Sequence, residues 1–505
     1  MNANNRMILN TVVMYVRLGI TMVITLLSSR WILLALGEED FGIYNLVAGL
    51  LGLLMFLNLS MATASQRYLS FALGKKDNKL LSETFYISIV LHFVIGILIL
   101  VFIEILGQFL LYNFLQVPSS KINLAVFCLH SLSINAFVTV ISVPYRASLI
   151  SHENIVFVAI TEIIVSISKL LLAIYLLYYL GNRLKMYAVI MALIPIIQTI
   201  IFRVYSRRYY PECKFAFHKL KNSLLFKDMA SYAGWNMIGS LSSLLRDQGI
   251  PMLLNSFYGI CMNTAYGLAL QVKGQLNFFS SSIVTSTKPQ IVKSEGAGNR
   301  PRSLALSAYT CKITFLLLSM LGIPLIVDMP YILELWLKIV PEYTVNFTRI
   351  IISICLVYQF AIGISMPVEA VGRIKNLQII VGGFHMLVIP IGYLMLRYGL
   401  SSSSVLFMII IEEIICVIVG LFISNRVTGL NIPKFVFQTI LPSLAATGVA
   451  YGLIYLLHDF MAAGFIRLII ICAASLFYFI AIGYSIVLTK EEKQKTNHII
   501  SLLFR

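Results

Sequence analysis

The stretch RVYSRRYYPECKFAFHKLKNSLLFK, residues 203–227, separates two long apolar halves of a 505-residue chain. It contains seven Lys or Arg residues and is the longest polar interruption in the interior of the chain. Such a segment cannot lie in lipid, because its charges and its backbone would lose water without replacement. We therefore predict that it is an extramembrane connector between two membrane-embedded halves.

The composition indicates a polytopic membrane protein. The chain is 59% hydrophobic and only 12% charged, with a mean hydropathy of +0.89, whereas about 25% of the residues in a soluble domain are charged. The net charge of +17 is explained by the Lys and Arg residues that collect in cytoplasmic loops, so we expect no nucleic-acid partner. The Cys and His residues lack the spacing of a metal site, and the sequence has no P-loop. We therefore expect neither a metal nor a cofactor.

A membrane-spanning helix needs about 20 mainly apolar residues, and fourteen segments of the sequence meet this requirement. They are residues 9–36, 42–72, 82–112, 122–149, 155–180, 186–205, 229–257, 263–289, 304–327, 344–370, 376–399, 404–424, 436–457 and 464–488. Most loop Lys and Arg residues fall on the side that holds both chain ends, which predicts cytoplasmic termini. The longest loop on the other side, residues 328–343, leaves little protein for a water-facing active site, so a transporter is favoured over a membrane enzyme.

The two halves of the sequence resemble each other at an offset of about 222 residues. Tyr44 falls on Tyr266, Gly74 falls on Gly296, and the Ser-x-Pro-x-x-Ala motif that starts at Ser142 falls on the one that starts at Ser365. Six spans lie within the offset, so the two repeats enter the membrane in the same sense. The alternative is convergence between apolar helices.

The repeat predicts two parallel six-helix bundles with two additional helices. The domains expected are an N-terminal lobe at 1–205, a basic linker at 206–228, a C-terminal lobe at 229–426, and two further spans with a cytoplasmic tail at 427–505. Pro144 and Pro367 are hinge candidates, because proline kinks a helix.

Ionisable side chains within the spans indicate a functional site, since each costs about 3 kcal/mol at the bilayer centre unless it has a partner or a wet cavity. Basic residues predominate, especially in spans 1, 7 and 8, which favours an anionic substrate. The candidates for binding the substrate are Arg17, Arg30, Arg246 and Lys273.

Acidic residues in the spans are candidates for ion coupling. They are Asp247, Glu412 and Glu413. The sequence leaves a structural alternative open for each, because Arg246 and Asp247 can neutralise each other and the two glutamates can form a buried structural patch. Glu162 and Lys169, two turns apart on one helix face, are a similar candidate for a structural pair.

Several short motifs resemble those of the Wzx-type oligosaccharide flippases of the multidrug/oligosaccharidyl-lipid/polysaccharide (MOP) superfamily. These motifs are Leu36-Gly37-Glu38-Glu39-Asp40-Phe41-Gly42-Ile43-Tyr44, Gln66-Arg67-Tyr68-Leu69-Ser70, Gly74-Lys75-Lys76-Asp77, Val143-Pro144-Tyr145-Arg146-Ala147, the stretch 248–259, and Lys288-Pro289-Gln290-Ile291. The resemblance covers nearly the whole chain.

The resemblance implies a V-shaped, MATE-like transporter in the bacterial inner membrane. Its substrate would be an undecaprenyl-diphosphate-linked oligosaccharide for O-antigen, capsule or exopolysaccharide assembly, moved by alternating access and coupled to a proton or sodium gradient. Membrane lipids, a polysaccharide polymerase and a chain-length regulator would be its partners. The competing hypotheses are a cation-coupled multidrug antiporter, a flippase for peptidoglycan lipid precursors and, less favoured, a polysaccharide polymerase.

Overall fold

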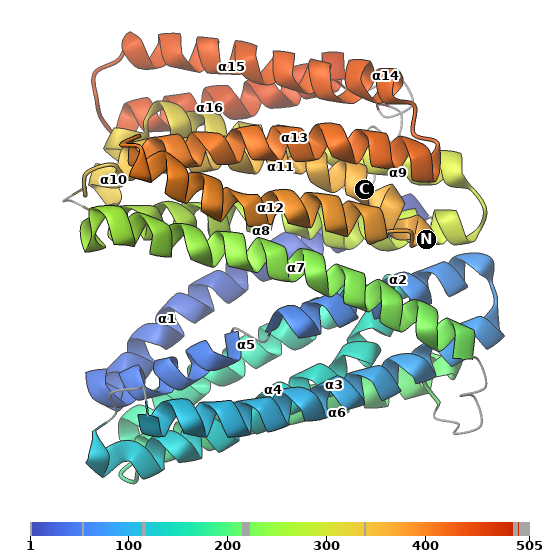
Figure 1. Ribbon diagram of the computed structural model, residues 1–505, viewed down its shortest axis with the longest axis vertical. Helices are drawn as coiled ribbons and strands as arrows, with labels where there is room; N and C mark the ends of the chain where they lie inside the picture. Colours follow the sequence, from blue (N-terminus) through green and yellow to red (C-terminus); the bar gives the residue numbers. More distant parts are fainter. Residues whose placement is uncertain are drawn as a thin grey trace. The chain divides into compact units, whose positions relative to one another are not determined.

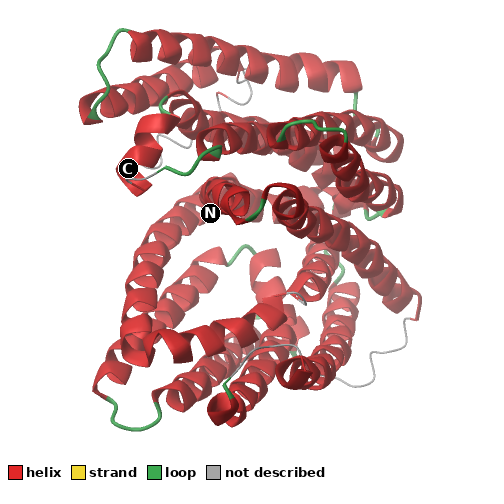
Figure 2. Cartoon of the chain, turned by 60° about the vertical axis from the view of Figure 1, so that its left-hand side comes forward, coloured by secondary structure: helices red, strands yellow, loops and turns green. Residues whose placement is uncertain are grey.

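The computed structural model describes residues 3–52, 55–113, 118–214, 223–337 and 340–487, together with Lys493. These residues form helices joined by short loops, with no strand among them (Figure 2). The chain divides into two compact units, which we call the N-terminal unit (residues 9–237) and the C-terminal unit (residues 238–505, with residues 1–8). The boundary between them falls inside one helix, α7, which runs from Ser223 to Tyr258.

The N-terminal unit contains six long helices and the first part of α7 (Figure 1). They are α1 (Ala3–Gly52), α2 (Met55–Lys75), α3 (Asn78–Asn113), α4 (Ile122–Ser151), α5 (Ile155–Tyr178) and α6 (Arg183–Tyr209). Short 3-10 turns precede α4 (η1, Ser119–Lys121) and follow α6 (η2, Pro211–Cys213). Buried apolar residues of α1, α3, α4, α5 and α6 form its largest core cluster.

The C-terminal unit has the same order of helices and then two more. Its elements are the rest of α7, α8 (Ile260–Gly296), α9 (Arg300–Val327), α10 (Met329–Leu337), α11 (Thr344–Val371), α12 (Lys375–Arg397), α13 (Ser402–Thr428), α14 (Ile432–Phe435), the π-helical turn η4 (Val436–Ile440), α15 (Leu441–Asp459), α16 (Phe465–Ile482) and the π-helical turn η5 (Gly483–Val487). Its main core lies among α7 to α13, and α15 and α16 pack on α9 around a second core cluster (Figure 1).

The internal repeat is present in the helix order. The pairs α3 and α9 start at Asn78 and Arg300, and α4 and α11 start at Ile122 and Thr344, which is 222 positions apart in both cases. Gly37, at the kink in α1, has φ 78° and ψ 169°, and Gly259, between α7 and α8, has φ 78° and ψ −169°. The two glycines are also 222 positions apart, so the same backbone turn joins the first two spans of each unit.

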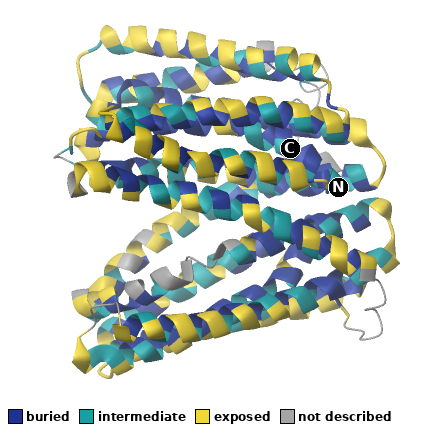
Figure 3. Ribbon diagram, viewed as in Figure 1, coloured by how far each residue is buried: buried dark blue, intermediate teal, exposed yellow. Residues whose placement is uncertain are grey.

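The spans agree with the expected all-α membrane fold. Within the described residues, eleven segments are long and apolar enough to cross a membrane. The other three predicted spans, 42–72, 229–257 and 263–289, fall on helices α1–α2, α7 and α8, which are more polar. Exposed residues are frequent along α15 (Figure 3), and many of them are apolar, such as Leu453 and Leu456. An apolar side chain at such a position is suited to contact with lipid.

The first part of the basic connector folds back on the N-terminal unit. Glu212 is buried, and its Oε1 lies 2.6 Å from Nε2 of His152 in the turn between α4 and α5. The neighbouring Cys213 is also buried, and burial raises the pKa of its thiol to about 12. Cys213 is therefore a small buried side chain with a neutral thiol. Residues 215–222 of the predicted connector lie outside the described residues.

The two glycine turns provide a test of the repeat. An added Cβ would meet no atom at Gly37 or Gly259, so replacement by Ala acts through the backbone alone. A side chain is strongly disfavoured at this combination of φ and ψ, by about 1–3 kcal/mol. We expect Gly37→Ala and Gly259→Ala each to lower the unfolding temperature of the purified protein.

The matched controls are Gly42→Ala and Gly267→Ala, where an added Cβ also meets no atom and the backbone has no positive φ. These helical positions should tolerate Ala or gain slightly from it. Equal unfolding temperatures for the Gly37 and Gly42 variants would contradict the assignment of backbone strain.

Candidate functional site

The C-terminal unit gathers six ionisable residues from four helices into what we call the C-cluster. They are Arg246 and Asp247 on α7, Lys273 on α8, His385 on α12, and Glu412 and Glu413 on α13. Small residues let α7 approach α12, since a Cβ on Gly382 would lie only 2.9 Å from Oγ of Ser242. One turn further along each helix, this close approach brings Arg246 against His385.

Arg246 is the centre of the C-cluster. Its Nη1 lies 2.7 Å from Oε1 of Glu413, 2.9 Å from Oε2 of Glu412 and 2.9 Å from Nδ1 of His385. Its Nε lies 3.5 Å from Oδ1 of Asp247. Arg246, His385, Glu412 and Glu413 are buried, whereas Asp247 is not. The guanidinium is therefore neutralised inside the unit, since an unpaired charge at this depth is costly.

The opposite end of the C-cluster is more open. Asp247 has a side chain 40% exposed, and its Oδ2 lies 3.4 Å from Nζ of Lys273. With the acids ionised and His385 neutral, three carboxylates face two cations, which leaves a surplus of one negative charge. This surplus can hold a proton or a monovalent cation. The predicted basic excess in spans 7 and 8 therefore does not describe this site, because the acids of α13 outweigh it.

Two residues of the C-cluster and the neighbouring Cys416 have the atom types of metal ligands. Nδ1 of His385, a carboxylate oxygen of Glu412 and Sγ of Cys416 all lie within 4.8 Å of one another. Arg246 already places a positive charge 2.9 Å from both His385 and Glu412. Repulsion from this guanidinium opposes a divalent cation at the same three ligands.

The N-terminal unit has a cluster of the opposite sign, which we call the N-cluster. Oε1 of Glu162 on α5 accepts a hydrogen bond from Nη2 of Arg146 on α4, at 2.7 Å. Glu162 also forms an ion pair with Arg17 on α1. Nε of Arg17 is buried and has no hydrogen-bond partner among the described residues. Two arginines share one carboxylate, so the N-cluster carries a surplus of one positive charge. Glu162 is engaged by these arginines and not in the predicted pair with Lys169.

The sequence candidates thus fall into different places. Arg246, Lys273, Asp247, Glu412 and Glu413 meet in the C-cluster, and Arg17 lies in the N-cluster. Arg30 is exposed on α1 and belongs to neither cluster.

Sequence reasoning missed the functional neighbours Arg146 and His385. Arg146 lies within the predicted span 122–149, and treating it as an ionisable residue of that span would have identified it. His385 lies within the apolar segment 376–399, and treating histidine as ionisable would have identified it. The hinge candidates Pro144 and Pro367 are buried inside α4 and α11 at corresponding positions of the repeat, and their role as hinges stays a prediction.

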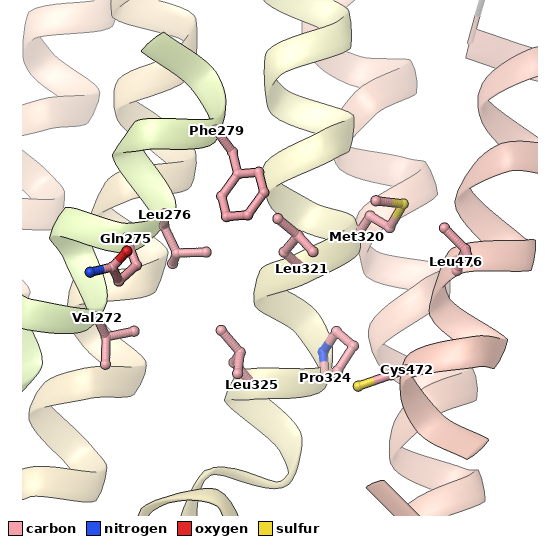
Figure 4. Close-up of a pocket in the computed structure, with 10 residues that line it drawn as sticks. All are labelled: Val272, Gln275, Leu276, Phe279, Met320, Leu321, Pro324, Leu325, Cys472 and Leu476. Carbon is pink, nitrogen blue, oxygen red and sulfur yellow. The ribbon is translucent and has the colours of Figure 1, made fainter. Parts of the chain in front are cut away.

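An apolar cavity of about 400 Å³ lies between α8, α9 and α16 (Figure 4). Its lining residues are Val272, Gln275, Leu276, Phe279, Met320, Leu321, Pro324, Leu325, Cys472 and Leu476. Gln275 is the polar amide of the lining, and none of these residues is charged. The cavity suits an aliphatic chain and not a phosphate or a sugar.

Comparisons with known proteins agree with this architecture. The MatE family model matches residues 12–175, which is less than half of the chain and includes the N-cluster. None of the curated proteins matches the chain in sequence.

Solved structures of the MATE type share the fold. An outward-facing multidrug resistance MATE family transporter of the MOP superfamily has a TM-score of 0.74 at 14% identity, with 85% of this chain and 97% of that chain covered. A MATE protein in the bent conformation has a TM-score of 0.75 at 14% identity, covering 86% and 97%. A MOP superfamily transporter from Pyrococcus furiosus, described as having a binding pocket of reverse polarity that suggests a different function, has a TM-score of 0.72 at 13% identity, covering 86% and 97%. The chain therefore has a MATE-like fold.

The pairing of Arg246 predicts a large effect on stability. Arg246→Ala leaves Glu412 and Glu413 buried without their counter-charge, and breaking a buried pair in this way costs about 3–5 kcal/mol. We expect a marked fall in the unfolding temperature of the purified protein in detergent. Lys273→Ala, at the open end of the C-cluster, should have a much smaller effect.

A compensated variant separates charge from packing. In Arg246→Met combined with Glu412→Gln and Glu413→Gln, no buried charge lacks a partner, so much of the lost stability should return. A triple variant as unstable as Arg246→Ala would show that side-chain shape, and not charge pairing, sets the stability of this site.

Proposed function

We propose that the protein is an ion-coupled transporter that moves an undecaprenyl-diphosphate-linked oligosaccharide across the bacterial inner membrane by alternating access, for surface polysaccharide assembly. The observation that carries the proposal is the division of charge between the two units. The N-cluster has a surplus of one positive charge, and the C-cluster has a surplus of one negative charge. An anionic substrate and a coupling cation would then use separate sites.

The N-cluster supplies the anion contact in this proposal. Arg17 and Arg146 share Glu162. The side chain of Arg146 is 47% exposed, so its guanidinium can donate hydrogen bonds to a further anion. Arginine suits a diphosphate because its planar fork binds two oxygens at once. The polyprenyl tail would remain in the lipid while the glycan crosses through a wet cavity.

The C-cluster supplies the coupling site. Glu412, Glu413 and Asp247 provide the negative surplus, and a proton or a sodium ion from the transmembrane gradient would neutralise it. Arg246 and Lys273 hold these acids in place and are not the primary contacts of the substrate. Membrane lipids, a polymerase and a chain-length regulator are the proposed partners.

Cation-coupled export of drugs is a second candidate. The acidic surplus of the C-cluster favours it, since a drug cation would be attracted to carboxylates. The fold itself does not separate the two functions, because the similar solved structures include a multidrug resistance transporter and a transporter described with a pocket of reverse polarity.

The test is a strain that lacks the gene, with its polyprenyl-linked oligosaccharides extracted and assigned to a leaflet. We expect complete repeat units to accumulate on the cytoplasmic face while surface glycan is lost. Unchanged glycan together with increased drug sensitivity would support the antiporter, and unpolymerised units on the outer face would support a polymerase.

Complementation of this strain assigns the anion site. Arg17→Ala and Arg146→Ala should each reduce surface glycan at least tenfold at equal protein level, because each removes a charge-assisted contact to the diphosphate, worth about 1.5–3 kcal/mol. The matched control is Lys121→Ala, which removes a cation of the same unit that is paired with Glu39 and Asp40 at 2.8 and 2.6 Å. Export that survives both arginine variants would rule out the N-cluster as the anion site.

A further inference from the structure

Lys169 is a cation at membrane depth that has no partner in the part of the chain that the structure describes. It lies on α5, fourteen residues after Ile155 at the start of the helix and nine before Tyr178 at its end. It forms no ion pair and no hydrogen bond with a described residue, and the carboxylate two turns away, Glu162, is shared by the two arginines of the N-cluster. An ammonium group at this depth is costly unless a wet cavity or a ligand compensates it.

The side chain of Lys169 lies on the inward face of α5. The opposite face of the helix carries the exposed apolar residues Ile160, Ile164, Ile167 and Leu171. At 3.6 residues per turn, Lys169 is rotated by about 180° from Ile160 and by only about 20° from Glu162, whose side chain contacts α1 and α4. Lys169 is nevertheless only half-buried. Its ammonium group therefore faces a space inside the N-terminal unit that water or a ligand can enter.

Polar side chains continue from the N-cluster along three helices. Each lies four, seven or eleven positions from the N-cluster residue of its own helix, a spacing that keeps it on the same helix face. The N-cluster lies towards the start of α1 and α5 and towards the end of α4, so these side chains extend from it in one direction. We call them the polar track, which consists of Thr21 and Ser28 on α1, Ser142, Thr139 and Asn135 on α4, and Ser166 and Lys169 on α5.

The polar track offers the groups that a sugar binds. The hydroxyls of Thr21, Ser142 and Ser166 donate to backbone carbonyls of their own helices at 2.8, 2.7 and 3.0 Å. Each hydroxyl oxygen keeps lone pairs that can accept a hydrogen bond from a sugar hydroxyl. A neutral glycan needs nothing more than such groups. The unpartnered charge of Lys169 among them is suited to a negatively charged one.

We propose that Lys169 binds a carboxylate of the glycan itself, so that the transported oligosaccharide contains an acidic sugar of the uronic acid class. This inference rests on the proposed function and deepens it by naming the class of substrate. Lys169 lies about 10 Å along α5 from Glu162. One substrate molecule then places its diphosphate at the N-cluster and its acidic sugar at Lys169.

The residue types favour this division of the two anionic groups. The planar fork of an arginine binds two oxygens at once and suits the diphosphate, whereas the ammonium of a lysine is a compact point charge. A single carboxylate is a sufficient partner for such a charge. The diphosphate is the other possible source of an anion for Lys169, and the two sources make different predictions for binding.

The first test is the charge of the oligosaccharide that accumulates in the strain lacking the gene. The oligosaccharide is freed from its polyprenyl diphosphate by mild acid and applied to an anion exchanger. We expect it to be retained, and to lose this retention once its carboxyl groups are reduced to alcohols. A neutral oligosaccharide, or retention that survives the reduction, would overturn the inference alone. Unchanged lipid-linked and surface glycan would refute the proposed function and the inference with it.

The second test measures binding to the purified full-length protein in lipid. The probes are the freed oligosaccharide, its carboxyl-reduced form and inorganic pyrophosphate. We expect Lys169→Met to weaken binding of the acidic oligosaccharide by about tenfold, because a charge-assisted contact is lost, and to leave binding of pyrophosphate unchanged. The matched control is Lys169→Arg, which keeps the charge and should keep most of the affinity. Arg146→Ala should instead weaken binding of pyrophosphate.

Three binding results would contradict the assignment. They are equal affinity of the wild-type protein for the acidic and the carboxyl-reduced oligosaccharide, an unchanged affinity for the acidic form in Lys169→Met, and a loss of pyrophosphate binding in that variant, which would assign Lys169 to the diphosphate. Misfolding does not confound the variant, since Lys169 has no described partner to lose. Its unfolding temperature should equal or exceed that of the wild-type protein.

Discussion

A charge within an apolar helix bundle requires a counter-charge, and this constraint organises both units. Each unit places an arginine on its first long helix against carboxylates from later helices, Arg17 on α1 and Arg246 on α7. The carboxylate of Glu162 joins α1, α4 and α5 in the N-cluster, and the three carboxylates of the C-cluster join α7, α8, α12 and α13. Neither cluster is balanced, since two arginines share one carboxylate in the N-cluster and three carboxylates face two cations in the C-cluster.

The repeat conserves the framework of the two units but not their charges. The glycine turns recur at the same offset, and Tyr44 and Tyr266 are both buried in edge-on contacts with another aromatic ring. The residues 222 positions before Arg246 and Glu412 are Ile24 and Ile190, both apolar. Backbone geometry and packing are thus shared, whereas the ionisable groups that define a site are particular to each unit. This is the arrangement expected if the two units have different tasks in one transport cycle.

The fold could be predicted from the sequence because its signals are local. Span length, apolar composition and the repeat depend on residues close to one another or at one constant offset. The pairing of charges depends on which helices are neighbours, and the partners of Arg246 lie 139 to 167 positions away. Composition alone therefore predicts an excess of basic residues in spans 7 and 8, where the structure shows a guanidinium neutralised by Glu412 and Glu413 of α13.

Arg246 lies on α7, the helix in which the chain passes from one unit to the other. The helix is continuous from Ser223 to Tyr258, and the boundary between the units falls between Met237 and Ile238. Arg246 lies eight residues, or about two helical turns, beyond this boundary. The ion pairs of Arg246 with Glu412 and Glu413 therefore hold the C-terminal part of α7 to α13, on the C-terminal side of this boundary.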